Sequence, residues 1–148
     1  MDCVFCKIAQ NKLPSYKIWE DKNHLAFLGI FPNTPGMCVV IPKKHSSGYA
    51  FSLKPKKLAA LISAAQKTAR LLDKKLGLER TAMIMEGTQI DHAHLKLYPL
   101  WSYKKSKNQT FPSYQPAFFK KYQGWLTSKE GPQATPKELQ KIYRKIIN

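Results

Sequence analysis

The chain has few acidic residues and few cysteines, and it lacks any long apolar run. Its 148 residues contain 9 Asp and Glu against 25 Lys and Arg, which gives a formal net charge of +16. No stretch reaches the roughly 18 apolar residues of a membrane-spanning helix, and residues 1–7 do not have the basic and then apolar build of a signal peptide. We therefore expect one compact cytoplasmic protein with no membrane partner, whose positive field attracts phosphorylated ligands.

Three cysteines, an odd number, argue against a disulfide framework. Cys3 and Cys6 form a Cys-x-x-Cys pair, which in a reducing compartment binds a metal or does redox chemistry. Cys38 lies in the apolar run of residues 37–41, and we interpret it as a small buried hydrophobic residue without a chemical role.

The spacing of apolar residues predicts an α+β protein. Pro55–Leu76 repeats its apolar residues at helical spacing, with proline near the first turn and Gly77 just past the end. Alternating, β-prone segments separated by turn residues predict five strands, preceded by a short helix over residues 3–11. The strands are expected at residues 15–20, 24–30, 36–41, 80–86 and 92–97. Hairpin order favours an antiparallel sheet with the helices on one face.

The pattern changes after the last predicted strand. Residues 101–148 carry ten basic and only two acidic groups, mixed with aromatic residues and prolines. Thr135-Pro-Lys-Glu138 is a capping box with proline at the first helical position, which predicts a helix to about Ile147. We divide the chain into a domain of residues 1–105 and an extension of residues 106–148 that packs on the domain or on a dimer partner.

The segment His92-Ala-His94-Leu-Lys96 places nitrogen-bearing side chains at alternate positions. In a strand these three groups stand over one face, while Ala93, Leu95 and Leu97 enter the core. On the pattern alone, a strand histidine with a structural hydrogen bond is a simpler interpretation than a catalytic one. His24 is interpreted as a surface strand residue.

Five segments in order resemble the histidine triad (HIT) family, whose signature alternates three histidines with apolar residues. They are Cys-Val-Phe-Cys-Lys-Ile at 3–8, Leu-Ala-Phe-Leu at 25–28, Pro-Gly-Met-Cys-Val-Val-Ile-Pro-Lys-Lys-His at 35–45, the helix of residues 55–76, and the histidine-rich strand. The resemblance implies a five-stranded antiparallel sheet with one long and one short helix, a homodimer, and a nucleotide ligand.

The resemblance implies that His94, the middle histidine, attacks the α-phosphorus of a nucleotide and forms a nucleotidyl-histidine, which water then hydrolyses. Lys96 stands where the family has its third histidine. Its ammonium can neutralise charge that develops on phosphate, and it lowers the pKa of His94 by like-charge repulsion. Because a related branch of nucleotidyltransferases has glutamine at this position, the chain is expected to be a hydrolase or a transferase.

The resemblance also implies a nucleotide pocket. Its apolar walls would hold the base, and Thr88 and Gln89 could donate hydrogen bonds to phosphate. Gly29 replaces the aspartate that usually binds the ribose hydroxyls, so that acceptor is missing. The expected wall residues, which would be core residues in any fold, are Val4, Phe5, Ile8, Phe27, Ile30 and Val39.

Bacterial relatives with the amino-terminal Cys-x-x-Cys bind zinc through four side chains. The corresponding residues here are Cys3, Cys6, His45 and His92. The resemblance therefore implies a structural Zn²⁺, because two thiolates and two imidazoles would make a closed tetrahedral set.

Two other functions remain open. Aromatic residues interleaved with lysines can hold a single-stranded nucleic acid, although the same rings can dock the extension on the core. These rings are Trp101, Tyr103, Phe111, Tyr114, Phe118, Phe119, Tyr122 and Trp125. Alternatively, the chain is a nucleotide-binding sensor without catalysis. Gly29 and the turn at residues 85–89, which is several residues shorter than the glycine-rich turn of relatives, would then leave no productive geometry for the phosphate.

Overall fold

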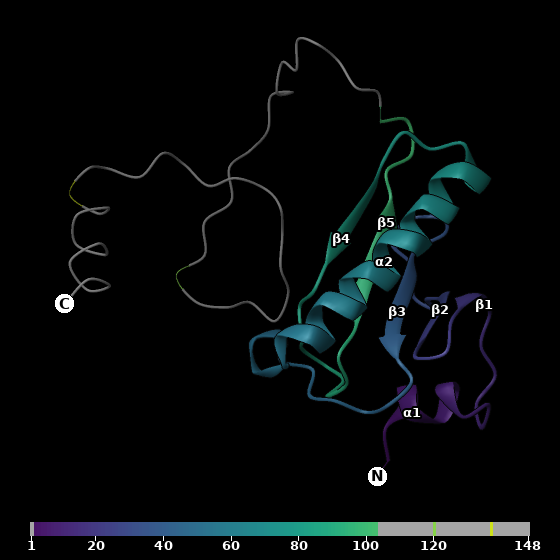
Figure 1. Cartoon of the computed structure of the whole chain (residues 1–148). Helices are drawn as coiled ribbons and strands as arrows, with labels where there is room; N and C mark the ends of the chain where they lie inside the picture. Colours follow the sequence, from purple (N-terminus) through teal and green to yellow (C-terminus); the bar gives the residue numbers. More distant parts are fainter. Residues whose placement is uncertain (1, 104–119, 121–136, 138–148) are drawn as a thin grey trace. The chain divides into compact units, whose positions relative to one another are not determined.

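A computed structural model of the chain describes residues 2–103 together with Lys120 and Lys137 (Figure 1). The chain divides into two compact units, Met1–Ser106 and Lys107–Asn148. The predicted C-terminal helix and all the aromatic residues of the extension lie outside the described residues. Within residues 2–103 no helix has the length and apolar character to cross a membrane.

The described part contains a five-stranded, fully antiparallel sheet, as the sequence predicts. The strand order is β1-β2-β3-β5-β4. The strands are β1 (Lys17–Glu20), β2 (His24–Leu28), β3 (Cys38–Pro42), β4 (Thr81–Ile84) and β5 (Leu95–Pro99). Two helices complete the predicted α+β class, α1 (Val4–Ala9) and α2 (Pro55–Leu76), with a short 3-10 turn at Ala50–Ser52.

Helix α2 covers one face of the sheet and crosses β3 and β5 (Figure 1). Its bounds agree with the prediction, and Gly77 ends it in the left-handed conformation at φ +66°. Leu61 and Ala65 from the helix are buried in one core cluster with Val40, Leu95 and Leu97 from the sheet. We call this side of the sheet the α2 face.

Helix α1 lies on the opposite face, so the prediction that both helices share one face is wrong. Phe5 and Ile8 from α1 form a second core cluster with Leu25, Phe27 and Val39. Leu25, Ala26 and Phe27 of β2 and the first four residues of β3 are all buried, so both sides of these strands carry apolar residues. A sheet that is apolar on both sides needs a cover on each, and α1 supplies the second.

The last strand starts at Leu95, and the prediction that it starts at His92 is wrong. Gln89 has a φ of +67°, and the amide of His92 donates to the carbonyl of Ile90, so residues 89–92 turn tightly. The predicted alternation is nevertheless confirmed, because Ala93, Leu95 and Leu97 enter the core under α2. Cys38 is fully buried as predicted, and burial raises the pKa of its thiol to about 12.

His24 is 7% exposed, which contradicts its interpretation as a surface residue. The carboxylate of Asp21 accepts the backbone amide of His24 at 2.7 Å and lies 3.3 Å from Nδ1 of its ring. This local turn draws the imidazole inward, where it contributes to a cavity on the α2 face.

Candidate active site and metal centre

A cavity of about 550 Å³ opens on the α1 face of the sheet. It is lined by α1, by β2 and β3, by residues 13–15 and 29–31, by the segment that leads to β5, and by Lys96 of β5. All ten residues predicted for catalysis and nucleotide binding line this one cavity. They are Val4, Phe5, Ile8, Phe27, Ile30, Val39, Thr88, Gln89, His94 and Lys96.

The inner wall of the cavity is aromatic. The Phe5 ring stands edge-on to the ring of Phe27, with centroids 5.7 Å apart, and edge-on to the imidazole of His94 at 5.3 Å. Ile30 is 77% exposed and Val4 39%, so these two residues lie at the rim. This aromatic and aliphatic lining is suited to hold a flat ring.

His94 is 3% exposed, and its Nδ1 lies 2.7 Å from the carbonyl oxygen of His92. A carbonyl only accepts hydrogen bonds, so the neutral ring carries its proton on Nδ1 and keeps the lone pair on Nε2. Burial lowers the pKa of His94, and the ammonium of Lys96 lowers it further. The predicted effect of Lys96 has the expected direction, but burial is the larger cause.

Lys96 forms an ion pair with Glu86, with Nζ 3.0 Å from Oε2 and both side chains largely buried. Sequence reasoning assigned no role to Glu86. The register of the sheet explains the contact, because Ile84 at the end of β4 pairs with Lys96 and Glu86 follows two residues later. The two groups together place a fixed cation and its counter-charge beside His94.

Two hydroxyl groups of the cavity lining lack partners. Among the described residues, the side-chain oxygens of Ser15 and Thr88 are buried and make no hydrogen bond. A buried hydroxyl without a partner is costly, and its presence in a cavity wall is expected where a ligand completes the bonding. Thr88 was predicted to bind phosphate, whereas Ser15 was missed because nothing nearby in the sequence marks it.

Gly29 lies against the side chain of Met37, another lining residue that the sequence did not indicate. A Cβ built on Gly29 would lie 2.7 Å from Cε of Met37 and 2.9 Å from Sδ. Met37 therefore fills the space beside the position where the family usually has a ribose-binding aspartate.

Four side chains meet at the amino-terminal end of α1. Cys3, Cys6, His45 and His92 offer ligand atoms that all lie within 4.8 Å of one another. Nδ1 of His92 is 3.4 Å from Sγ of Cys3 and 3.5 Å from Sγ of Cys6, and Nδ1 of His45 is 3.4 Å from Sγ of Cys6. This group could hold a metal ion, and it contains the four residues that the resemblance implied.

The hydrogen bonds and protonation of these side chains also favour a bound cation. Nε2 of His92 lies 2.8 Å from the carbonyl oxygen of Pro42, which fixes the proton on Nε2 and leaves Nδ1 as a ligand atom. Burial lowers the pKa of His92, which keeps the ring neutral. Burial and the adjacent Cys3 raise the pKa of the Cys6 thiol, so two thiolates side by side require a neighbouring positive charge.

Comparison with known proteins agrees with this geometry. The crystal structure of a member of the HIT family from Bacillus subtilis superposes with a TM-score of 0.65 at 27% identity and covers 99% of this chain and 96% of its own. The five-stranded sheet with its two helices is thus the HIT fold.

The HIT domain family matches residues 10–99, and the chain belongs to the histidine triad family. An uncharacterized HIT-like protein of Methanocaldococcus jannaschii is 32% identical over 102 residues, or 66% of this chain and 78% of that protein. The adenosine 5′-monophosphoramidase of Schizosaccharomyces pombe is 29% identical over 119 residues, or 77% of this chain and 86% of that enzyme.

Proposed function

We propose that the protein is a nucleotide hydrolase that cleaves a bond at the α-phosphorus through a nucleotidyl intermediate on His94. The observation that carries this proposal is the hydrogen bond of 2.7 Å from Nδ1 of His94 to the His92 carbonyl, which leaves Nε2 with a lone pair in the wall of an apolar cavity. The similarity to a relative named adenosine 5′-monophosphoramidase supports a nucleoside phosphoramidate as substrate.

The reaction has two steps. Nε2 of His94 attacks the α-phosphorus, the bond from phosphorus to the amine breaks, and the amine takes up a proton from solvent as it leaves; the water of the second step returns a proton to solvent. Water then attacks the same phosphorus, the bond from phosphorus to Nε2 breaks, and the nucleoside monophosphate is released. A transferase would use an acceptor hydroxyl or phosphate in place of water.

The other lining residues bind and orient the substrate in this proposal. The part of the cavity beside Phe5 and Phe27 takes the base, and the hydroxyls of Ser15 and Thr88 donate to phosphate oxygens. Lys96, held by Glu86 at 3.0 Å, compensates the negative charge that develops on phosphate.

We propose zinc as the occupant of the Cys3, Cys6, His45 and His92 group. A tetrahedral zinc, with Zn–S of about 2.3 Å and Zn–N of about 2.0 Å, places sulfur and nitrogen ligands roughly 3.5 Å apart. The three sulfur-to-nitrogen distances of 3.4 and 3.5 Å fit this arrangement. With four protein ligands the set would leave no open position, so a bound metal would be structural: Cys3, Cys6, His45 and His92 would hold it and thereby tie α1 to the segment that carries His94.

A homodimer is proposed from the two edges of the sheet. The β1 edge carries the charged residues Lys17 and Glu20, whereas β4 carries no charge and leaves Met83 49% and Ile84 38% exposed. Uncharged, apolar edge strands pair with further chains. Light scattering after gel filtration should report a dimer for the natural chain and a monomer for Ile84→Lys.

Mass spectrometry of protein quenched during turnover tests the catalytic proposal. With adenosine 5′-phosphoramidate, the intact chain should gain one adenylyl group on His94, and AMP should accumulate. His94→Ala should give neither product. Turnover by His94→Ala would refute the proposed nucleophile, and tight AMP binding without adduct or turnover would identify a binding protein instead.

A further inference from the structure

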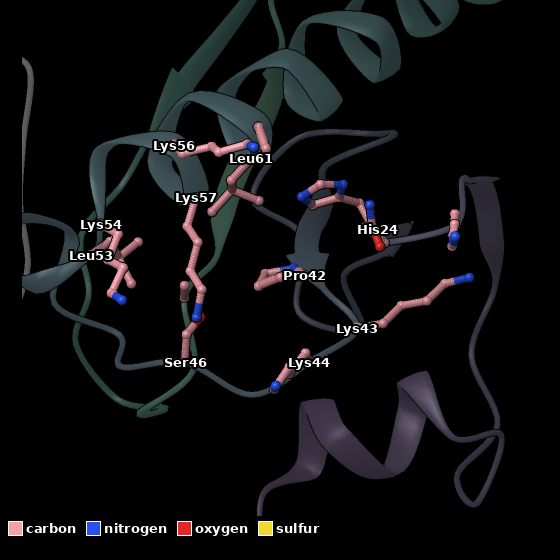
Figure 2. Close-up of a pocket in the computed structure, with 14 residues that line it drawn as sticks. His24, Pro42, Lys43, Lys44, Ser46, Leu53, Lys54, Lys56, Lys57 and Leu61 are labelled. Carbon is pink, nitrogen blue, oxygen red and sulfur yellow. The ribbon is translucent and has the colours of Figure 1, made fainter.

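A second cavity, of about 510 Å³, lies on the α2 face and shares no lining residue with the first (Figure 2). It is bounded by the turn before β2, by the end of β3 with the residues after it, and by the first turns of α2. Its floor is apolar, because Leu61 and Ala93 are almost fully buried there. The volume lies within the range of small-molecule sites.

The rim of this cavity is exceptionally basic. Six lysines line it, although residues 2–103 contain only thirteen. They come from three separate segments of the chain, and among the described residues no Asp or Glu lines the cavity. They are Lys22, Lys43, Lys44, Lys54, Lys56 and Lys57.

These lysines are largely uncompensated. Lys43 is paired with Glu20, with Nζ 2.5 Å from Oε1. Within the part of the chain that the structure describes, the other five form no ion pair. Like charges gathered around a concave, apolar floor repel one another more than they do on an open surface, so an anion there is favoured.

The position of the lysines on α2 opposes the stability of the helix. Lys56 and Lys57 lie in its first turn, at the positive end of the helix dipole, where no acidic residue occurs and Lys54 provides no side-chain cap. Lys74 and Lys75 lie in the last turn, where cations are favourable. A bound anion at the first turn would turn the unfavourable arrangement into a favourable one.

His24 adds a buried polar group to the floor. It is 7% exposed, and its ring points toward Leu61 and Lys57 of α2 (Figure 2). Nδ1 faces the carboxylate of Asp21 at 3.3 Å, while Nε2 has no hydrogen-bond partner among the described residues. Nε2 is thus the ring atom left to meet a ligand.

We propose that this cavity binds a small anion with two or more phosphate groups and an apolar or ring-shaped body. The lysine ammonium groups would bind the phosphates as mobile point charges, and the floor of Pro42, Leu61 and Ala93 would bury the body of the ligand. Concavity and the apolar floor favour a small ligand over a nucleic-acid strand. The proposal does not depend on catalysis by His94.

Calorimetric titration of the full chain with inorganic tripolyphosphate tests the proposal. The double variant Lys56→Gln/Lys57→Gln should weaken binding about tenfold, whereas the matched variant Lys74→Gln/Lys75→Gln should bind as the natural chain does. All four lysines are exposed and lie on the same helix, so each variant removes the same charge. The first variant should also raise Tm, because it relieves repulsion with the helix dipole.

Four results would overturn the proposal. They are an absence of binding by the natural chain, equal weakening by the two double variants, loss of binding in His94→Ala, and tighter binding of a short single-stranded oligonucleotide through the same lysines. Equal weakening by the two double variants would indicate only a diffuse positive field. Loss of binding in His94→Ala would place the phosphates in the other cavity.

Discussion

The α2 face of the sheet is covered by a helix of 22 residues, whereas the α1 face is covered by a helix of only 6. The longer helix buries Leu61, Ala64, Ala65, Thr68 and Leu72 along its length. The shorter one buries Phe5 and Ile8 and has no side-chain cap at its start. Helices shorter than about 12 residues are marginal without other contacts.

The difference shows how stability and chemistry are divided in this fold. Cys3 and Cys6, at the start of the short helix, approach His45 and His92, so the α1 face has a group that could hold a metal ion where its core is small. His94 lies two residues beyond His92 on the same side. We infer that packing stabilises the α2 face and that the metal group stabilises the α1 face, where the proposed reaction occurs.

The largest expected effect is on the α1 face and concerns the reaction alone. His94→Ala should lower kcat for adenosine 5′-phosphoramidate by about 10⁴-fold, because the nucleophile is removed. The far-ultraviolet circular dichroism spectrum should not change, since the core under α2 does not include His94. AMP release, followed by chromatography, measures the effect; a loss below tenfold would contradict the assignment.

Loss of a candidate metal ligand, or of the metal itself, should destabilise the α1 face more than the α2 face. Cys6→Ser, or treatment with a chelator, should lower the free energy of unfolding by about 3 kcal/mol or more. Amide exchange should accelerate in α1 and in residues 85–94 but remain slow in α2, because the candidate ligands include Cys3 and Cys6 at α1 and His92 but no residue of α2. Metal analysis should give one zinc per natural chain and less for the variant.

Uniform acceleration of exchange over both helices would contradict this division. Cys38→Ser is the matched control for a lost thiol. Cys38 is fully buried in the other core cluster and is not one of the four candidate metal ligands. It should change the free energy of unfolding but not the zinc content.

A substitution in the core of the α2 face should have the opposite pattern of effects. Leu61 lies on the sheet-facing side of α2 and is 1% exposed, so Leu61→Ala should lower the free energy of unfolding by about 2–4 kcal/mol through lost burial and the remaining cavity. Zinc content and kcat per folded molecule should stay as in the natural chain. Urea denaturation measures the first effect, and a fall in zinc content would show that the two faces are not independent.

The α2 face was also more predictable from the sequence. Pro55 and Gly77 mark both ends of the long helix, and its apolar repeat identifies the packed side. These signals are local, because helix ends depend on residues within one turn of them. The side on which α1 lies was predicted wrongly, although the unbroken apolar run of residues 37–41 already indicates a strand buried on both faces.

The α1 face depends on contacts between distant residues, and sequence patterns describe those poorly. The spacing of Cys3, Cys6, His45 and His92 is not a recognised finger spacing, and the set followed only from the family resemblance. Glu86 and Ser15 were missed because their partners, Lys96 and the cavity, are set by strand register and loop packing. The strand start at Leu95 was missed because Gln89 adopts a positive φ that its residue type does not favour.

The smallest expected effect concerns Lys96, and it tests whether the α1 face needs a histidine at the third triad position. Lys96→Met should lower kcat/KM about tenfold, because the variant loses the cation that faces the phosphate and leaves Glu86 without its 3.0 Å partner. Lys96→His should retain activity within about threefold, since a protonated imidazole can still pair with the Glu86 carboxylate. Steady-state kinetics with adenosine 5′-phosphoramidate compares the two variants.

Equal activity of Lys96→Met and the natural chain would mean that charge at this position is not used. A loss in Lys96→His as large as that in Lys96→Met would mean instead that the length of the lysine side chain matters, and the site would then differ from its relatives in geometry as well as in residue type.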